Sequence, residues 1–354
     1  MNAVILKSKG KTFSMWKEAT IKKSMLEICP TFWLYTTDFS RGDLSQWEYK
    51  LGDECTIEIC GKVVITGYIE DVIARTTKNG GNFIEISGRE KICDLIDCSY
   101  NGDSKEWKNQ NVGTLIQNIC RFFSIDVFSE QAVEGRLREI VPMFSVSDGT
   151  TAIDHIVRLC NSVGVLPISK GDGKLTLAEG TKTVFATDKI DRAANILETH
   201  VRLSNKKRFS EYTYRGQGKN NEDGTISDWT QCTGKFSDSL IKRERPFSGF
   251  IFLLANSGKC EMAAKWKAHI AAGLSRIVLY TIPSWDQSDG TLWEINNLIS
   301  VKDSVYKISD TKLIIEVEYL LTENSIKTII TVADKNTFST ASSLDIKFPG
   351  IDND

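Results

Sequence analysis

The sequence predicts a mainly β protein with an α+β insert, made of two related small β-barrel domains and a small α/β domain. Three observations lead to this prediction: strand patterns dominate the first 99 residues, helical spacing begins at Val112, and strand patterns return at Val184. A chain of 354 residues is also too long for one ordinary core. We therefore divide it into a first β-barrel domain (1–99), an α/β domain (100–183), a second β-barrel domain with one helix (184–336) and a C-terminal tail (337–354).

The stretch from Glu54 to Ser99 carries the clearest strand signal. Apolar and polar residues alternate from Glu54 to Cys60, which is typical of a half-buried strand. Val63 to Ile73 is rich in β-branched residues, and Gly67 inside it indicates a bulge or a close backbone approach. Asn79 to Asn82 then predicts a tight turn. With the strand patterns between residues 4 and 36, the stretch provides about six strands, enough for a small barrel.

Helical spacing marks the α/β domain. Apolar residues from Val112 to Phe123 predict one helix, and the capping residues Asp148 to Thr150 precede a second helix that ends near Gly164. A hairpin with its turn at Gly171 to Lys174 follows. Two helix-then-strand units in succession suggest a weak internal repeat.

The strand patterns after Val184 echo the first domain. Phe247 to Leu254 is short and apolar enough for a buried strand, and the hairpin from Leu313 to Val332 is regularly patterned. Between them Cys260 to Leu274 predicts a helix with one apolar face, formed by Met262, Trp266, Ile270 and Leu274. From Thr337 the chain is rich in Ser and Thr and then acidic, which predicts a tail without its own core.

Composition restricts the class of protein. The apolar share of 41% and the charged share of 25% are typical of a folded soluble chain, and a net charge of -2 argues against nucleic-acid binding. No apolar run approaches the ~20 residues needed to span a membrane, so we expect no membrane insertion. The nine cysteines include no CxxC pair, which favours reduced, buried thiols over a disulfide framework.

Several short segments lie in a characteristic order along nearly the whole chain. They are Thr66 to Ile69, Gly88 to Lys91, Asp94 to Cys98, Trp107 to Asn109, Arg208 to Thr213, and Asp289-Gly290 with Leu292-Trp293 and Asn297-Leu298. Together they resemble the baseplate hub protein of Mu-like contractile-tailed phages. The helix-then-hairpin pattern of the α/β domain also resembles the small domain of T-even phage central hubs and of the hub part of type VI secretion spikes. No single segment is a catalytic signature, so the resemblance rests on order and spacing.

The resemblance implies a structural assembly protein rather than an enzyme. It implies a homotrimeric ring that links the central membrane-piercing spike to the tail tube, contacts other baseplate proteins, and adapts threefold to sixfold symmetry. Such a virion protein is assembled in the host cytoplasm. We expect no catalytic, cofactor-binding or metal-binding residue.

Two alternatives of other classes stay open: a tail-associated cell-wall hydrolase, and a carbohydrate-binding or receptor-binding β-module. Asp94 and Asp97 are spaced to approach each other on a helix, as the two carboxylates of a glycosidase would. The match to the hub family favours a structural cap instead. Asp154 and His155 are adjacent on a helix and do not face each other, so we interpret His155 as a surface residue. His200 and His269 lack neighbours at metal-ligand spacing. The tryptophans at 33, 47, 107, 266 and 293 fit core or interface positions better than a sugar-binding platform.

Two glycine-containing segments partly resemble phosphate loops. Gly171 to Lys174 and Gly216 to Lys219 both lack the full P-loop pattern, so we interpret them as turns. Asp286 to Gly290 lacks the first and third ligands of an EF-hand. The basic segments Lys206 to Arg208 and Lys242 to Arg245 are either solvated loop charges or polar contacts with a neighbouring subunit or partner.

Overall fold

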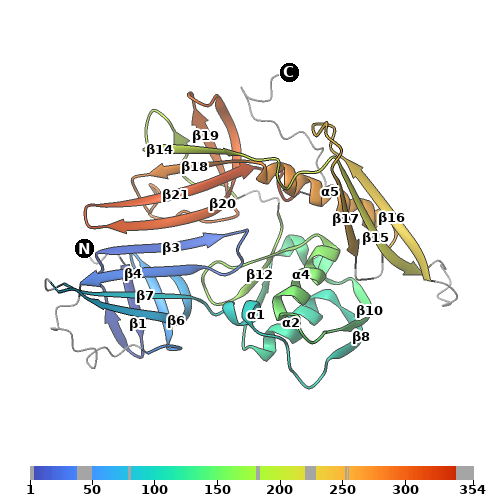
Figure 1. The fold of residues 1–354 in the computed structure, drawn as a ribbon, viewed down its shortest axis with the longest axis horizontal. Coiled ribbons are helices and arrows are strands. Elements are labelled where there is room, and N and C mark those ends of the chain that lie inside the picture. The colour runs from blue at the N-terminus through green and yellow to red at the C-terminus, as the bar shows by residue number, and fades with distance from the viewer. Residues whose placement is uncertain are drawn as a thin grey trace.

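The structure is a computed structural model that describes residues 4–37, 50–78, 81–180, 184–219, 229–251, 253 and 255–339. Within these ranges the fold is mainly β with a helical insert, which confirms the predicted fold class (Figure 1). The expected loops at 40–47 and 220–227, and residues 79 and 80 of the expected turn, lie outside the described residues.

The first β unit is an antiparallel sheet formed by residues 4–90. Its strands are β1 (Val4–Ser8), β2 (Lys11–Phe13), β3 (Glu18–Ser24), β4 (Thr31–Thr37), β5 (Glu54–Ile59), β6 (Lys62–Thr76) and β7 (Asn82–Glu90). They lie in the order β3-β4-β7-β6-β5-β1-β2. Alternate side chains face the core, where Ile21, Leu34, Ile57 and Ile86 are fully buried. No pairing among the described residues closes this unit into a complete ring of strands.

Gly67 allows the close packing of backbone that its sequence context predicts. A Cβ atom at this position would lie 1.9 Å from the carbonyl oxygen of Arg89 on the neighbouring strand β7, a distance that any side chain would violate. The irregularity in the β6–β7 pairing lies a few residues later, between Ile69 and Asp71. Gly67 thus marks close approach, and the bulge is at Glu70.

The middle unit is a small α/β domain with its own core. It contains α1 (Cys93–Asp97), β8 (Glu106–Asn111), α2 (Val112–Phe122), β9 (Val127–Ser129), the 3-10 helix η2 (Gln131–Val133), α3 (Glu134–Leu137), β10 (Ile140–Ser145), α4 (Ala152–Val163), β11 (Leu166–Ile168) and β12 (Leu175–Ala178). The apolar faces of α2 and α4 pack together, as their spacing predicts. Thr151 is the N-cap of α4 and forms a capping box with Asp154, one residue later than expected. Gly164 ends the helix with φ 65°.

The second β unit contains β13 (Ile190–Asp191), β14 (Glu198–Leu203), β18 (Arg276–Ile282), β19 (Leu298–Asp303), β20 (Ile308–Thr322) and β21 (Ser325–Asp334). An insertion between β14 and β18 forms a separate sheet of β15 (Glu211–Lys219), β16 (Trp229–Ser237) and β17 (Pro246–Ile251), against which helix α5 (Ser257–Leu274) packs. β17 is an edge strand of this sheet and its Phe250 is exposed, so the prediction of a fully buried strand was wrong here.

The two β units share one strand order. In the first unit the neighbours are β3-β4-β7-β6-β5-β1, and in the second they are β14-β18-β21-β20-β19-β13. Strands at the same place in the two orders also follow one another in the same sequence along the chain. In each unit a six-residue strand is followed by a fifteen-residue strand and then by a third strand: these are β5, β6 and β7 in the first unit and β19, β20 and β21 in the second. Both long strands also contain a register shift, between Ile69 and Asp71 in β6 and between Ile314 and Glu316 in β20. One difference is that β1 pairs antiparallel with β5, whereas β13 pairs parallel with β19.

The two β units are joined by direct strand pairing. β3 of the first unit lies antiparallel to the second part of β20, from Glu316 opposite Ser24 to Leu321 opposite Ala19 (Figure 1). The first part of β20 pairs on the same side with β19, so one long strand contacts both units. The result is a continuous sheet of 13 strands.

Helix α5 is buried around much of its circumference rather than along the single stripe predicted from its sequence. Met262 is 38% exposed, whereas Ala264, Ala268 and His269 are fully buried. The helix packs on β15 and β16 and also contacts β18 and β21, so several of its faces meet protein.

The expected C-terminal tail begins later than predicted. Phe338 belongs to the main core, and its carbonyl accepts a hydrogen bond from Nε1 of Trp266 at 3.0 Å. The carbonyl of Ser339 lies 2.7 Å from Nδ1 of His269. Residues 337–339 are therefore docked on α5, because the buried polar groups of that helix need these carbonyls as partners. Residues 340–354 lie outside the described residues.

Two truncations test the docking of this segment. Deleting residues 340–354 should leave the melting temperature nearly unchanged. Deleting residues 337–354 should lower it by about 5–10 °C, because burial of a Phe side chain contributes about 3 kcal/mol and two carbonyl partners are also lost. Calorimetry measures both, and Phe338→Ala in the full chain is the matched control. Equal melting temperatures for the two truncations would contradict the docking.

Candidate assembly interface

Several strand edges of the large sheet lack a partner among the described residues, those of β2 and β13 among them, and two of these edges belong to the strands equivalent to β3 and β20. One is the outer edge of β14, which pairs only with β18. The other is the second part of β6, since its pairing with β5 ends at Tyr68. Both edges carry exposed apolar side chains, Ile73 at 53% and Leu203 at 44% exposure. Open edges with apolar residues are typical of surfaces that pair with another chain.

The edge pairing already present inside the chain shows what such a contact contains. Where β3 meets β20, Ile21 and Tyr319 are opposite each other and fully buried. On the outer face, Nζ of Lys22 lies 3.2 Å from the carboxylate of Glu316. The contact thus combines backbone pairing, an apolar inner row and an ion pair on the outer face.

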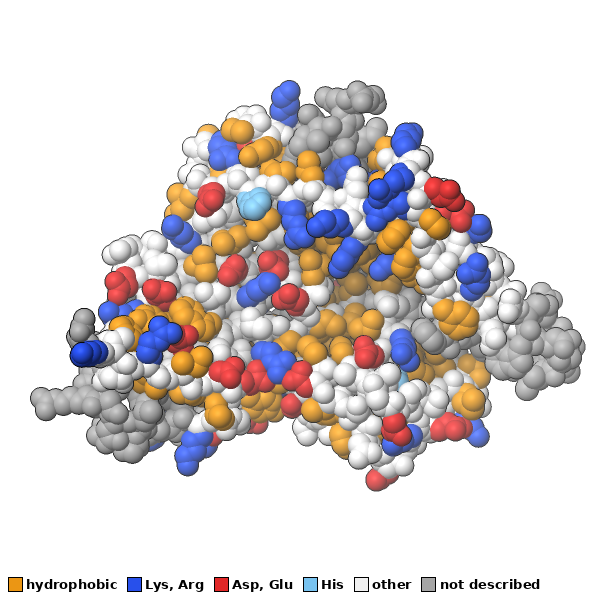
Figure 2. Space-filling model, in the orientation of Figure 1, with side chains coloured by type: hydrophobic (Ala, Val, Ile, Leu, Met, Phe, Trp, Pro, Cys, Tyr) orange, Lys and Arg blue, Asp and Glu red, His pale blue; other side chains and the backbone are white. Residues whose placement is uncertain are grey.

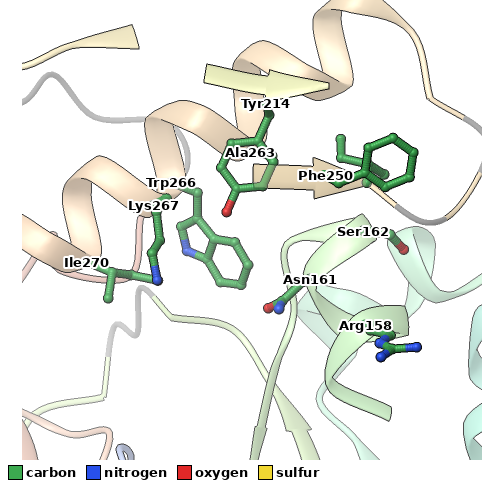
Figure 3. Close-up of a pocket in the computed structure, with 10 residues that line it drawn as sticks. Arg158, Asn161, Ser162, Tyr214, Phe250, Ala263, Trp266, Lys267 and Ile270 are labelled. Atoms are coloured by element: carbon green, nitrogen blue, oxygen red, sulfur yellow. The ribbon is translucent and has the colours of Figure 1, made fainter. Parts of the chain in front are cut away.

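A cavity of about 180 Å³ lies between the middle unit and the inserted sheet (Figure 3). Trp266, Lys267 and Ile270 line it from α5, Tyr214 and Phe250 from the inserted sheet, and Arg158 from α4. Nζ of Lys267 lies 5.6 Å from the centroid of the Phe247 ring. Burial, together with the charge of Lys207, lowers the pKa of Lys267. Asn161 and Ser162 of α4 also line the cavity, so its lining combines apolar and aromatic side chains with polar and cationic groups.

The two basic segments of the sequence come together near this cavity. The guanidinium of Arg245 donates hydrogen bonds to the carbonyls of Asn205 at 2.6 Å and Lys206 at 2.7 Å. On one face of the molecule, Figure 2 shows several Lys and Arg side chains beside an apolar hollow. Four basic residues of the two segments are exposed: Lys206, Lys207, Lys242 and Arg243. We name these four residues the basic cluster.

Arg208 differs from the other members of its segment and is not a solvated loop charge. It is fully buried, and its Nε donates to Asp238 at 2.5 Å. A buried guanidinium needs such a partner because the desolvation of an unpaired charge is costly. Arg208 therefore has a structural role. The residues of the basic cluster fit both interpretations given above, solvated loop charges and polar contacts with a neighbouring subunit or partner.

A buried carboxylate joins the middle unit to the first β unit. Glu90, at the end of β7, is fully buried; it accepts hydrogen bonds from the hydroxyl of Ser169 and, at 2.7 Å, from the backbone N–H of Gly173. Burial raises the pKa of Glu90 to about 7, although both hydrogen bonds and Lys23 act in the opposite direction. The segment from Gly171 to Lys174 is thus the turn that the sequence predicts, and its role is to dock on the first β unit.

The candidate acid and base residues are engaged in structural contacts. Asp97 accepts from the guanidinium of Arg89 at 3.1 Å, and Arg89 also binds Glu70 with two bonds of 2.6 Å. This hydrogen bond lowers the pKa of Asp97, whereas burial and the charge of Asp97 raise that of Asp94. Asp97 thus ties α1 to Arg89 of β7, which in turn binds Glu70 of β6, whereas the N-cap of α1 is Ile92 and has no side-chain hydrogen bond.

The prediction that His155 lies on the helix surface was wrong. Its side chain is 1% exposed, its Nε2 lies 2.7 Å from Oγ1 of Thr150, and its ring packs edge-on to Phe144. Burial lowers its pKa. Asp154 accepts from Thr151 as part of the capping box and is not paired with His155. Of the other two histidines, His269 is buried and His200 is exposed on β14.

Gly216 to Lys219 is part of strand β15, so its interpretation as a turn was also wrong. The glycines are needed because Ala255 packs against them. A Cβ atom at Gly218 would lie 2.0 Å from the carbonyl oxygen of Ala255. In the segment from Asp286 to Gly290, the carboxylate of Asp289 accepts from Thr187 and Thr291 at 2.6 Å, so it is a turn-forming residue.

The tryptophans fit the predicted core or interface positions. Trp107, Trp266 and Trp293 are buried. Trp33 is half-buried and stacks on Tyr35, with the two ring centroids 6.0 Å apart. Trp47 lies outside the described residues. In the described ranges no group of three or more His, Cys, Asp or Glu is placed to hold a metal ion, and no helix is long and apolar enough to cross a membrane.

Comparison with known proteins agrees with this architecture. Residues 3–90 match the family described as Mu phage baseplate assembly protein GpP-like, N-terminal; residues 92–179 match baseplate hub protein gp44-like, second domain; and residues 257–341 match Mu phage baseplate assembly protein GpP, fourth domain. Baseplate hub protein gp44 of Escherichia phage Mu is 27% identical over 347 residues, covering 95% of this chain and 89% of that protein. The chain is similar to the Mu-like baseplate hub proteins over nearly its whole length.

Solved structures extend the relationship to the fold. The 43 kDa tail protein of prophage MuSo2 from Shewanella oneidensis has a TM-score of 0.79 and 25% identity, covering 95% of this chain and 99% of that one. The E. coli c3393 protein, a component of the type VI secretion system, shares the fold with a TM-score of 0.56 and 10% identity, covering 92% of this chain and 76% of that one. The predicted resemblance to Mu-like hubs is confirmed, and the relationship supports a structural role in a phage tail baseplate.

The Glu90 junction predicts a specific pH dependence. The pKa of Glu90 is higher in the folded protein than in the unfolded chain, so the folded state binds the extra proton between about pH 4.5 and about pH 7. Stability should therefore fall as pH rises through this window, by on the order of 3 kcal/mol from this group. Urea unfolding at several pH values should show the fall in the wild type and a smaller one in Glu90→Gln. Parallel pH profiles for the two proteins would rule out Glu90 as the source.

The contacts of the acidic and histidine candidates also predict an absence of hydrolase activity. Purified protein should not clear a peptidoglycan suspension, since Asp97 is held by Arg89 and His155 is buried. A turbidity assay with a known muramidase as the positive control measures this. Clearance that disappears in Asp94→Asn or His155→Ala would establish the hydrolase alternative instead.

Proposed function

We propose that this protein is the central hub of a contractile phage tail or prophage-derived tail, forming a homotrimeric ring between the membrane-piercing spike and the tail tube. One observation carries the proposal. The two β units have the same strand order, yet only one of two equivalent edge contacts is made inside the chain. β3 of the first unit pairs with β20, whereas β14 and β6, which occupy the equivalent positions, have open edges among the described residues.

The equivalence of the two units gives the register of the missing contact. Glu316 of β20 corresponds to Asp71 of β6, because each is the first paired residue after the register shift of its strand. Glu316 pairs there with Thr331, and Asp71 pairs with Ser87. In the same way Lys22 of β3 corresponds to Arg202 of β14 through their partners on β4 and β18. If β14 of one subunit meets β6 of the next as β3 meets β20, Ala74 lies opposite Val201.

The side chains at this predicted contact are complementary. Arg202 and Asp71 replace Lys22 and Glu316, so the ion pair of the outer face keeps its sign and position. Leu203, which is exposed in the single chain, comes to lie opposite Val72. Burial of such side chains favours association by roughly 25 cal/mol per Å² of apolar surface. β14 and β6 lie on opposite sides of the pair of β units (Figure 1).

A head-to-tail contact of this kind produces a closed ring when the rotation from one subunit to the next, repeated around the ring, adds up to a full turn. Three subunits with two similar β units each present six similar surfaces to a sixfold tail tube, while the ring itself stays threefold for a threefold spike. The paired edges are then protected from aggregation. The basic cluster is left for an acidic surface of the spike or another baseplate protein. The protein acts in the virion tail after assembly in the host cytoplasm, without enzymatic activity.

Cross-linking tests both the ring and its register. The variant Ala74→Cys with Val201→Cys should form disulfide-linked dimers and trimers under mild oxidation, because directly opposite residues have Cβ atoms about 4.5–5.5 Å apart. Non-reducing gels and light scattering, with the protein alone and with its spike, measure the products.

The matched control is Ala74→Cys with Thr199→Cys, which is out of register by two residues. It should give far less cross-linked product, as should each single variant. A particle that is a dimer or tetramer, or equal cross-linking of the two double variants, would refute the proposed ring.

A further inference from the structure

Two cysteines far apart in the sequence lie side by side in the inserted sheet. The sulfur of Cys232 on β16 is 3.7 Å from the sulfur of Cys260 in the first turns of α5. Cys260 is buried in a small apolar cluster with Ile251 and Ala255, whereas Cys232 is half-exposed. Cys232 is therefore the more accessible of the two residues.

The backbones of the two elements are already close enough for a covalent link. Two residues beyond Cys232, a Cβ atom on Gly234 would lie 2.1 Å from the backbone nitrogen of Glu261, next to Cys260. A disulfide requires the two Cα atoms to be about 5.5 Å apart and the sulfurs to be about 2 Å apart. The sulfurs, 3.7 Å apart, must therefore approach by about a further 1.7 Å for the bond to form.

We propose that Cys232 and Cys260 are a thiol pair that forms an intramolecular disulfide when the protein meets a low-molecular-weight disulfide. The thiolate of Cys232 attacks one sulfur of the reagent, forms a mixed disulfide and releases the first reagent thiol. The thiolate of Cys260 then attacks the sulfur of Cys232 and releases the second reagent thiol. In total the reagent disulfide is reduced to two thiols, the two cysteines are oxidised, and their two protons are transferred to the released thiolates.

The second step determines how fast the pair closes. Burial raises the pKa of Cys260 to about 12, with a smaller contribution from Cys232. Since only the thiolate reacts, closure should accelerate about tenfold per pH unit below that pKa. The resulting bond joins α5 to β16. The chain between the two cysteines contains Lys242 and Arg243 of the basic cluster. The chemistry does not depend on the proposed ring, although a virion released from a reducing cytoplasm would meet oxidants.

The test uses the purified full-length protein with its two exposed cysteines, Cys60 and Cys98, changed to serine, and excess oxidised glutathione at about pH 8; every variant below is made in this background. We expect this protein to lose the mass of two hydrogens, two of its remaining thiols to disappear in a titration of the denatured chain, and a peptide map to link Cys232 to Cys260. The melting temperature should rise by several degrees, because the bond restricts the unfolded chain. Cys232→Ser, at a half-exposed position compatible with folding, should abolish all four changes.

Cys120→Ser is the matched control. Cys120 is fully buried beside Cys160 in the middle unit, so its substitution should leave the reaction unaffected. Three results would overturn the proposal: a glutathione adduct on Cys232 that persists, cross-links between chains that depend on Cys232, or an unchanged loss of two thiols in Cys232→Ser. None of these results bears on the trimeric ring, so failure of this proposal and failure of the proposed function are distinguishable.

Discussion

The pairing of β3 with β20 is the contact on which the arrangement of this protein depends. It turns two sheets of the same strand order into one, and it does so because β20 is long enough to hold β19 with its first part and β3 with its second. The contact also accounts for a buried lysine. Lys23 lies on the inner side of β3 and is 1% exposed, and its Nζ reaches Glu294 of the second β unit at 3.0 Å. A buried ammonium of this kind is tolerated only with such a partner.

The middle unit has its own core and is attached by a few specific contacts rather than by a shared sheet. The turn at Gly171 brings its backbone against Val64 of β6, where a Cβ atom would lie 1.8 Å from the carbonyl oxygen. Glu90 fills the same junction from β7. Such attachment suits the proposed function, in which the protein presents surfaces to its partners at fixed angles. The strand pairing and the Glu90 junction together hold all three units in one body.

A repeated unit inside one chain also explains why the surface carries unpaired strand edges. Each unit has the same potential contact, and only one of the two can be made within a single chain. The remaining edges are an aggregation hazard in an isolated protein and a connection in an assembly. The prophage MuSo2 tail protein and the type VI secretion component share this fold at 25% and 10% sequence identity.

The sequence alone determined what depends on neighbours along the chain. Alternation in the first meander predicted strands, the spacing after Val112 predicted a helix, and Gly67 predicted either a bulge or a close backbone approach, since each is a local pattern. The tertiary structure decided what depends on distant partners. His155 is buried because Phe144 packs against it, and Arg208 is internal because Asp238 lies beside it. Gly216 to Lys219 is a strand because it pairs with β16. The candidate interface belongs to this second group. Periodicity can show that a residue lies on a strand, but which strand edges find partners is set by long-range pairing.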